Sequence, residues 1–273
     1  MKVIDIHTHP KGFSGQGLSC PVEEAVAAAL EQMDRCDIVM SGILGHVAPF
    51  QTAESVREGN HYTERMVNLH PDRFFGMCFV NPALAESAVR EELTRRLESP
   101  AFRGIKLELD VNCRSALLDP VMEMAIRHDV PVLHHSWYVN PWTVENDKTQ
   151  ENRSEPHDVA DLARRFPEAR IIMAHMEGSN VRGILDIADL ENVWIDTSGS
   201  QPFSGTLEFA VKTLGSRRIL FGSDLFLRGL ASQLGRILGT PLSPEDRENI
   251  FHRNARAVFR LPLEQEDSSA ATP

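Results

Sequence analysis

Val3-Ile4-Asp5-Ile6-His7-Thr8-His9-Pro10 begins as a short apolar run and ends in two histidines one residue apart. The run predicts a β-strand, and alternate side chains of a strand point to the same face. His7 and His9 are therefore expected on one side, with Cα atoms about 6–7 Å apart. This spacing lets two imidazoles converge on one divalent ion. A His-x-His pair alone is weak evidence for a metal, so the rest of the chain decides its meaning.

Short β-rich runs recur along the whole chain, at intervals of roughly 20 to 40 residues. After residues 3–7 they span 38–44, 74–80, 104–109, 131–136, 171–175, 193–197 and 219–223. The intervals carry amphipathic helical patterns. Helices are predicted at 22–33, 53–69, 84–98, 119–129, 156–166, 181–190, 205–214 and 226–238.

Eight strands alternating with eight helices are typical of a parallel (β/α)8 TIM barrel of the α/β class. A doubly wound open sheet also fits this alternation. It would be expected to carry a Gly-rich phosphate turn after the first strand, where this chain has His-Thr-His-Pro. We predict one barrel domain over residues 1–262 and a disordered tail over 263–273, which is acidic and rich in small residues.

The composition is that of an ordinary soluble enzyme, with a formal net charge of −11. This charge disfavours nucleic acid and anionic membrane surfaces as partners. No run approaches the roughly 18 apolar residues of a membrane-spanning helix, and no signal peptide precedes Lys2. The four cysteines form no CxxC pair. We therefore expect reduced thiols in a cytoplasmic protein.

Polar residues capable of chemistry stand at the carboxyl ends of three later strands. The run 131–136 contains His135, the run 171–175 ends in His175, and Asp224 follows the last run. Barrel enzymes assemble their sites at this edge. Imidazole and carboxylate donors together suit zinc and, less selectively, iron or manganese. The sequence therefore predicts one bound divalent metal ion, with zinc favoured.

These features resemble the amidohydrolase superfamily, in particular its amidohydrolase-2 branch of metal-dependent barrels. The resemblance covers nearly the whole chain and rests on motifs spread along it. They are Asp5-Ile-His-Thr-His-Pro, Pro71-Asp-Arg-Phe with Val80-Asn-Pro, Gly104-Ile-Lys-Leu, Pro131-Val-Leu-His-His, Ala174-His-Met-Glu-Gly, Asp196-Thr-Ser-Gly, Phe221-Gly-Ser-Asp and Asn254-Ala-Arg-Ala.

The resemblance implies that His7, His9 and His135 hold the metal, with Asp224 as a ligand or general base and His175 as a catalytic residue. A metal held in this way lowers the pKa of a bound water towards about 7. His134 occupies a place where the family is usually apolar. Strand alternation turns His134 away from its neighbour, so we interpret it as packed against a helix.

The run 104–109 places Lys106 and Glu108 on the face opposite three apolar residues, so both should point into the barrel. One option is that a side chain of this strand bridges two metal ions. We favour a single metal ion, with Lys106 and Glu108 contacting the substrate. Trp137 and Arg228 are further candidates for substrate binding. The segment 137–155 is predicted to form a lid or substrate wall. Together, Lys106 and Arg228 hint at a substrate that carries a carboxylate.

Three functional hypotheses remain open for a small-molecule substrate. The main one is a hydrolase that uses a metal-activated water to cleave an amide, lactone or ester bond. The alternative is a metal-dependent non-oxidative decarboxylase of an aromatic or unsaturated acid, since the resembled branch contains both activities. The third is an inactive binding relative, which should have lost ligands, whereas every motif position here is filled. The resemblance also allows a homodimer.

Overall fold

The structure is a computed structural model that describes residues 2–14, 17–45, 51–138, 145–147, 150–200 and 203–262. Eight parallel strands form one sheet in the order β1-β4-β5-β6-β7-β8-β9-β10. They are β1 (Val3–Thr8), β4 (Ile38–Ile43), β5 (Phe74–Phe79), β6 (Phe102–Leu107), β7 (Val132–His134), β8 (Ile171–Met173), β9 (Val193–Asp196) and β10 (Ile219–Leu220). The predicted strand positions are confirmed, although β7, β8 and β10 are shorter than expected.

The sheet closes on itself where the first and last strands meet. Ile6 donates its backbone N–H to the carbonyl of Phe221 at 3.0 Å, and the N–H of Asp224 reaches the carbonyl of His7 at 2.8 Å. Closure leaves no open sheet edge between these strands, which confirms the predicted (β/α)8 barrel.

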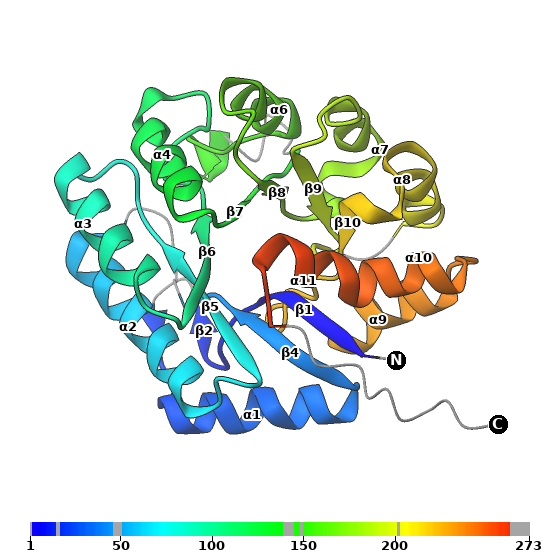
Figure 1. The fold of residues 1–273 in the computed structure, drawn as a ribbon, viewed down its shortest axis with the longest axis horizontal. Helices are drawn as coiled ribbons and strands as arrows, with labels where there is room; N and C mark the ends of the chain where they lie inside the picture. The colour runs from blue at the N-terminus through cyan, green and yellow to red at the C-terminus, as the bar shows by residue number, and fades with distance from the viewer. Residues whose placement is uncertain are drawn as a thin grey trace.

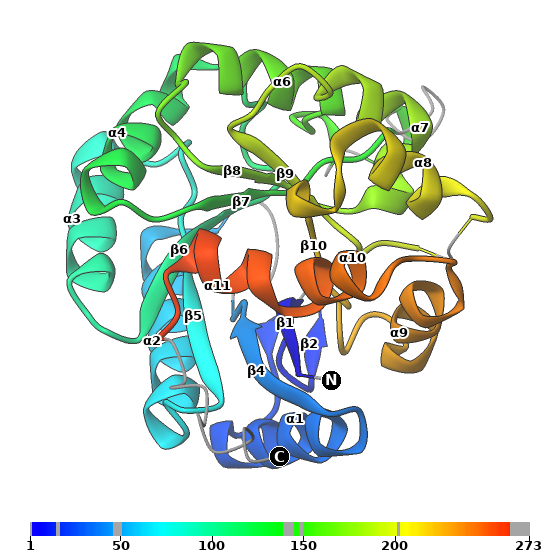
Figure 2. The same ribbon diagram turned by 45° about the vertical axis from the view of Figure 1, so that its right-hand side comes forward.

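An outer ring of helices covers the strands, as both views show (Figures 1 and 2). Its members are α1 (Val22–Arg35), α2 (Ala53–Leu69), α3 (Glu86–Leu97), α4 (Asp119–His128), α6 (Pro156–Arg165), α7 (Met176–Asp186), α8 (Thr206–Leu214) and α9 (Leu230–Gly239). A large buried apolar cluster fills the space between ring and strands and includes Val26, Ile105 and Val132. A second cluster, including Leu133 and Ile172, fills the barrel interior.

A C-terminal helical segment closes one end of the barrel and was not predicted. It comprises α10 (Pro244–Glu248), a π-helical turn (Asn249–Arg253) and α11 (Asn254–Phe259). The ring of Phe259 lies 5.0 Å from that of Phe75, and Gly104 leaves room for it, because an added Cβ there would lie 3.1 Å from Phe259. Phe75 and Gly104 stand near the amino ends of their strands. The opposite, carboxyl ends are therefore the open mouth of the barrel.

The structure also differs from the prediction in two loops. A two-stranded hairpin of β2 (Phe13–Ser14) and β3 (Gly17–Leu18) follows β1. Helix α7 begins at Met176, directly after β8, and not near residue 181. Its early start is hidden in the sequence because Gly178 and Ser179 are poor helix formers, and Asn180 interrupts the helix with non-helical backbone angles.

Two predicted segments fall partly or wholly outside the described residues. In the predicted lid, 137–155, residues 139–144 and 148–149 lie outside them, and so does the whole predicted tail at 263–273. Within the described residues of the lid, the backbone N–H of Trp137 donates to the backbone carbonyl of Ser154 at 3.3 Å. This hydrogen bond joins the two ends of the predicted lid segment. No helix among the described residues is both long and apolar enough to cross a membrane.

Candidate active site and metal centre

Two histidines and one carboxylate converge where β1 meets the chain after β10. Nε2 of His9 lies 3.3 Å and Nε2 of His7 lies 3.8 Å from Oδ1 of Asp224, and all three side chains are buried. Two donors bound to one tetrahedral ion, with bonds of about 2.0–2.1 Å, stand about 3.3 Å apart. Within the described chain, Oδ1 of Asp224 accepts no regular hydrogen bond. This set therefore fits a divalent metal.

The charge of Asp224 is suited to that role. Burial alone would raise the pKa of this carboxyl, but the contact with His9 and the nearby rings of His175 and His7 outweigh it. The pKa of Asp224 therefore lies well below its usual range, and the group is ionised at neutral pH. Asp224 also has a positive φ of 61°, so the turn after β10 aims its side chain back into the mouth.

A second carboxylate, Asp196 at the end of β9, contacts the same centre from the other side. Its Oδ2 lies 2.7 Å from Nδ1 of His7, and its Oδ1 accepts hydrogen bonds from Ser198 Oγ at 2.6 Å and from the backbone N–H of His175 at 2.9 Å. Burial opposes ionisation of Asp196, yet His7 and the hydrogen bonds keep its pKa well below the usual range. Asp196 is not among the site residues predicted from the sequence, although it ends an apolar strand just as His175 and Asp224 do.

His175 stands between two other histidines of the site. Its Nδ1 lies 2.8 Å from Ser198 Oγ and its Nε2 lies 3.1 Å from Nδ1 of His135. Burial, reinforced by the neighbouring His135, holds the pKa of His175 well below its usual value. The donor atoms of His7, His175 and Asp196 also lie close enough together to form a potential ligand set. His135, a predicted ligand, belongs to neither set and lies beside His175 instead.

The four predicted substrate-binding residues lie around the same mouth. The ammonium of Lys106 is fully buried, 2.9 Å from Oε1 of Glu108, and the other Glu108 oxygen is 3.2 Å from Nδ1 of His135. Trp137 stacks on the ring of His135 with 19° between planes and centroids 6.4 Å apart. Arg228 is 45% exposed, with Nε 3.7 Å from Oδ2 of Asp224. The structure thus brings a cationic and aromatic wall next to the histidines.

The neighbouring His134 has a different environment. It is fully buried, pairs across the sheet with Leu107, and its Nδ1 lies 2.7 Å from the carbonyl of His135. Leu107 belongs to the apolar cluster between strands and helices, so His134 lies on the helix side as the sequence analysis interprets it. Burial lowers the pKa of His134 to about 4, so the ring is neutral at physiological pH.

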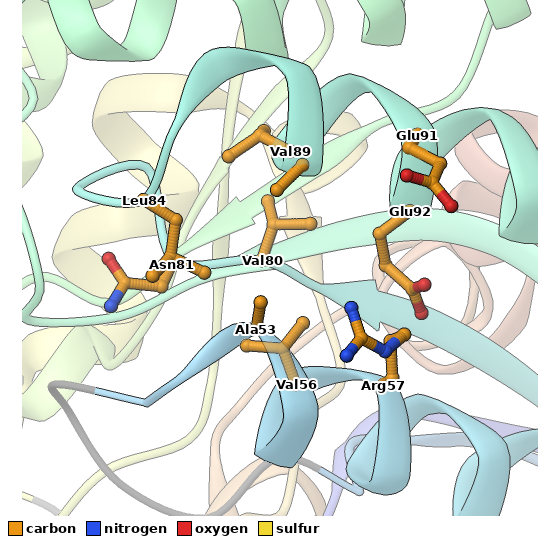
Figure 3. A pocket seen from close by; sticks show the side chains of 10 residues that line it. Ala53, Val56, Arg57, Val80, Asn81, Leu84, Val89, Glu91 and Glu92 are labelled. Atoms are coloured by element: carbon orange, nitrogen blue, oxygen red, sulfur yellow. The ribbon is translucent and has the colours of Figure 1, made fainter.

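A pocket elsewhere in the molecule contains none of the predicted site residues. It lies between α2 and α3 on the outside of the barrel, with Val56 on one wall, Val80 at its base and Val89 on the other wall (Figure 3). Glu92 and Arg57 lie at one end of it. The chemistry-bearing side chains described above therefore gather at the barrel mouth and not in this outer pocket.

The family model described as amidohydrolase matches residues 4–261. The chain belongs to the amidohydrolase family. It is therefore an enzyme of this family, as the sequence analysis expected from the motifs at the strand ends. Membership also agrees with the barrel and with the potential ligand sets at its mouth.

Solved structures similar to this amidohydrolase cover almost all of it. 2,6-Dihydroxybenzoate decarboxylase from Rhizobium is 19% identical, with a TM-score of 0.71, over 95% of this chain and 98% of that one. Dihydroxybenzoic acid decarboxylase from Polaromonas sp. JS666 was solved with manganese and the inhibitor 2-nitroresorcinol. It is 18% identical, with a TM-score of 0.74, over 95% of this chain and 97% of that one. 4-Oxalomesaconate hydratase from Rhodopseudomonas palustris is 17% identical, with a TM-score of 0.69, over 94% of this chain and 95% of that one. At these identities the likeness shows a common fold.

Proposed function

We propose that this amidohydrolase is a metal-dependent non-oxidative decarboxylase of a small aromatic carboxylic acid. The observation that carries the proposal is the barrel mouth, where a buried set of histidine and aspartate donors adjoins Lys106 and Trp137. An anionic, planar substrate matches such a wall, because the ammonium attracts its charge and the indole stacks on its ring. The decarboxylases among the structural neighbours support the same choice over the hydrolase reading.

His7, His9 and Asp224 would hold one divalent ion, and His135 would complete the donor set. When bound, the ion supplies positive charge that orients and stabilises an acid with an adjacent oxygen group. Manganese is present in several similar decarboxylase structures, whereas the residue types here also suit zinc. We therefore propose a single ion and compare manganese with zinc in the test below.

We assign the proton donor to His175. The reaction adds a proton to the ring carbon that bears the carboxylate. The bond from that carbon to the carboxylate carbon then breaks, its electron pair returns to the ring, and CO2 leaves. Because burial lowers the pKa of His175, an imidazolium formed beside an anionic substrate is a strong acid and transfers its proton readily. Ser198 fixes the orientation of this ring through Nδ1.

Hydrolysis is the second candidate, supported by the ionised carboxylate of Asp224 among the potential ligands. In that reaction Asp224 would orient a water and accept its proton as the water attacks a carbonyl carbon. Decarboxylation needs no attacking water. The two candidates therefore predict different products from different substrates, and one set of assays separates them.

The test is turnover by protein reconstituted with Mn²⁺ or with Zn²⁺, on hydroxybenzoic acids and on lactones and amides. We expect release of CO2 from at least one hydroxybenzoic acid. In D2O, one deuterium should appear at the ring carbon that carried the carboxylate. Cleavage of a lactone or amide, with every aromatic acid left intact, would contradict the proposal and establish hydrolysis.

A further inference from the structure

We propose that Asp196 is a positioning residue that sets the tautomers of three histidines, so that Nε2 of His7 and of His135 present lone pairs to the metal. The inference rests on the metal centre of the proposed function. It adds Asp196 as a residue that orients the ligands without binding the metal itself. The carboxylate acts directly on His7, and through Ser198 on His175 and then on His135. One buried charge thus orients rings that come from three different strand ends.

The direct contact is between Asp196 and His7. Oδ2 of Asp196 lies 2.7 Å from Nδ1 of His7, and both side chains are almost completely buried. Its other oxygen, Oδ1, already accepts from three donors, namely the N–H groups of His175 and Ser198 and the hydroxyl of Ser198. Three donors on Oδ1 keep this carboxyl group ionised, so Oδ2 accepts and Nδ1 of His7 donates. The lone pair of His7 then lies on Nε2, which faces Asp224.

The indirect path follows from the single proton of the Ser198 hydroxyl. This proton points to Asp196, because Ser198 Oγ and Asp196 Oδ1 are only 2.6 Å apart. Ser198 Oγ therefore accepts from Nδ1–H of His175, at 2.8 Å. With its proton on Nδ1, neutral His175 has its lone pair on Nε2. That atom accepts from Nδ1–H of His135, at 3.1 Å, and Oε2 of Glu108 lies 3.2 Å from the same Nδ1. Both acceptors keep the proton of His135 on Nδ1 and its lone pair on Nε2.

The distance between Asp196 and His7 distinguishes a positioning role for Asp196 from direct binding of the metal. Two donors on one tetrahedral ion stand about 3.3 Å apart, whereas Oδ2 of Asp196 and Nδ1 of His7 are 2.7 Å apart, a hydrogen-bond distance. The pair of His9 and Asp224 does have the ligand spacing, at 3.3 Å. Ligating histidines generally donate their other ring N–H to a carboxylate or carbonyl, which fixes the tautomer. His7 follows that rule with Asp196 as its acceptor.

Asp196→Asn tests the inference with almost no change of shape. The amide oxygen can replace Oδ1 as the acceptor of the two backbone N–H groups, which places the amide NH2 against Nδ1 of His7. His7 must then accept at Nδ1 and carry its proton on Nε2, where the metal should bind. We expect the affinity for Mn²⁺ to fall about 10- to 100-fold, the usual effect of losing such a partner. In ¹⁵N spectra of the metal-free protein, His7 should change from the Nδ1–H to the Nε2–H tautomer.

Ser198→Ala is the second variant, because it breaks the indirect path and, at Nδ1 of His7, removes only the longer contact of 3.3 Å with Ser198 Oγ, leaving that with Asp196 at 2.7 Å. The tautomer of His7 should stay as in the wild type, that of His175 should no longer be fixed, and Mn²⁺ affinity should fall less than in Asp196→Asn. Asp158→Asn is the matched control. Asp158 is a buried carboxylate at the start of α6 that accepts from Glu155 N–H and Asn112, and it is not hydrogen-bonded to His7, Asp196 or Ser198. It should leave Mn²⁺ affinity unchanged.

The inference is overturned if His7 keeps the same tautomer in Asp196→Asn, or if the variant binds Mn²⁺ within threefold of the wild type. Tautomers are read in the metal-free protein, so this result does not depend on turnover. A wild type that binds Mn²⁺ but decarboxylates no aromatic acid would contradict the proposed function alone. Loss of metal in Asp196→Asn would then still support the role of Asp196.

Discussion

The two sides of the barrel mouth are built differently. On the closed side, His7, Asp196, Ser198 and Asp224 are at most 5% exposed at their side chains, and hydrogen bonds connect His7, Asp196 and Ser198. On the open side, Glu108 and His135 are 12% and 20% exposed, and Trp137 is half-buried. Lys106 is the buried member of the open side, beneath Glu108.

This difference separates two tasks within one site. Donors that must hold an ion with fixed geometry need locked rings, and the hydrogen bonds of the closed side provide that rigidity. Groups that receive a substrate must be reachable from solvent, as Glu108, His135 and Trp137 of the open side are. Variants of the closed side should therefore lose metal. On the open side, variants of Lys106, Glu108 and Trp137 should keep metal and change turnover or KM, whereas variants of His135 should also affect the metal, because His135 would complete the donor set.

The largest effect is expected for His7→Ala on the closed side. Loss of this donor should remove the metal and lower kcat/KM by at least about 10³-fold, since every proposed step requires the bound ion. Metal content by elemental analysis and turnover check this outcome. His61→Ala, on the exposed surface of α2, is the matched control and should retain both. A metal content equal to that of the wild type in His7→Ala would remove His7 from the ligand set.

Glu108→Gln should have the next largest effect and should spare the metal. The change leaves the buried ammonium of Lys106 without its counter-charge and weakens the contact with His135, so we expect a Tm lower by several degrees and kcat lower by about 10- to 100-fold. Adding Lys106→Met should recover Tm without recovering kcat. If Glu108→Gln instead releases the metal, Glu108 serves the metal centre, either as a ligand or through His135, and the division between the two sides is wrong.

Trp137→Ala should raise KM for an aromatic acid by about tenfold, because an aromatic pair contributes about 0.5–1.5 kcal/mol beyond area burial. Trp137→Phe should keep most of the affinity. The two variants are compared by steady-state kinetics at equal metal content. Equal KM values in wild type and Trp137→Ala would show that the indole does not contact the substrate.

A smaller effect is expected for Arg228→Gln. Arg228 is 45% exposed, so solvent and salt screen its attraction for an anionic substrate. We expect KM to rise only about two- to fivefold, and the difference from the wild type to shrink as ionic strength increases. A change larger than about tenfold, independent of salt, would place Arg228 among the buried contacts of the substrate.

The smallest effect on turnover, and a distinct one on stability, is expected for Asp5→Asn. Burial raises the pKa of Asp5 from 3.8 to about 7, and Oδ2 has no hydrogen-bond partner among the described residues. A raised pKa means that the fold favours the protonated acid, so this contribution to stability is present below pH 3.8 and lost as pH rises through 7. The neutral amide lacks this dependence. The Tm of Asp5→Asn relative to wild type should therefore increase between pH 4 and 7 and then level off, and a constant difference would contradict the raised pKa.

The sequence predicts much of this molecule because local patterns determine it. Apolar runs mark the eight strands, and a polar residue at the end of a run marks His175 and Asp224. The role of Asp196 is not visible in the same way, since its partner His7 lies 189 residues earlier and only barrel closure brings them together. Likewise α11 follows no strand, so the alternation that predicts the other helices gives no reason to expect it.

The meeting of β1 with the segment after β10 also has a consequence for biosynthesis. His7 leaves the ribosome more than 200 residues before Asp224, its neighbour in the folded protein. A nascent chain that lacks the last strand has no complete donor set and cannot close the sheet. Uptake of the proposed metal would therefore report that the barrel has closed, which makes it a natural assay of correct folding.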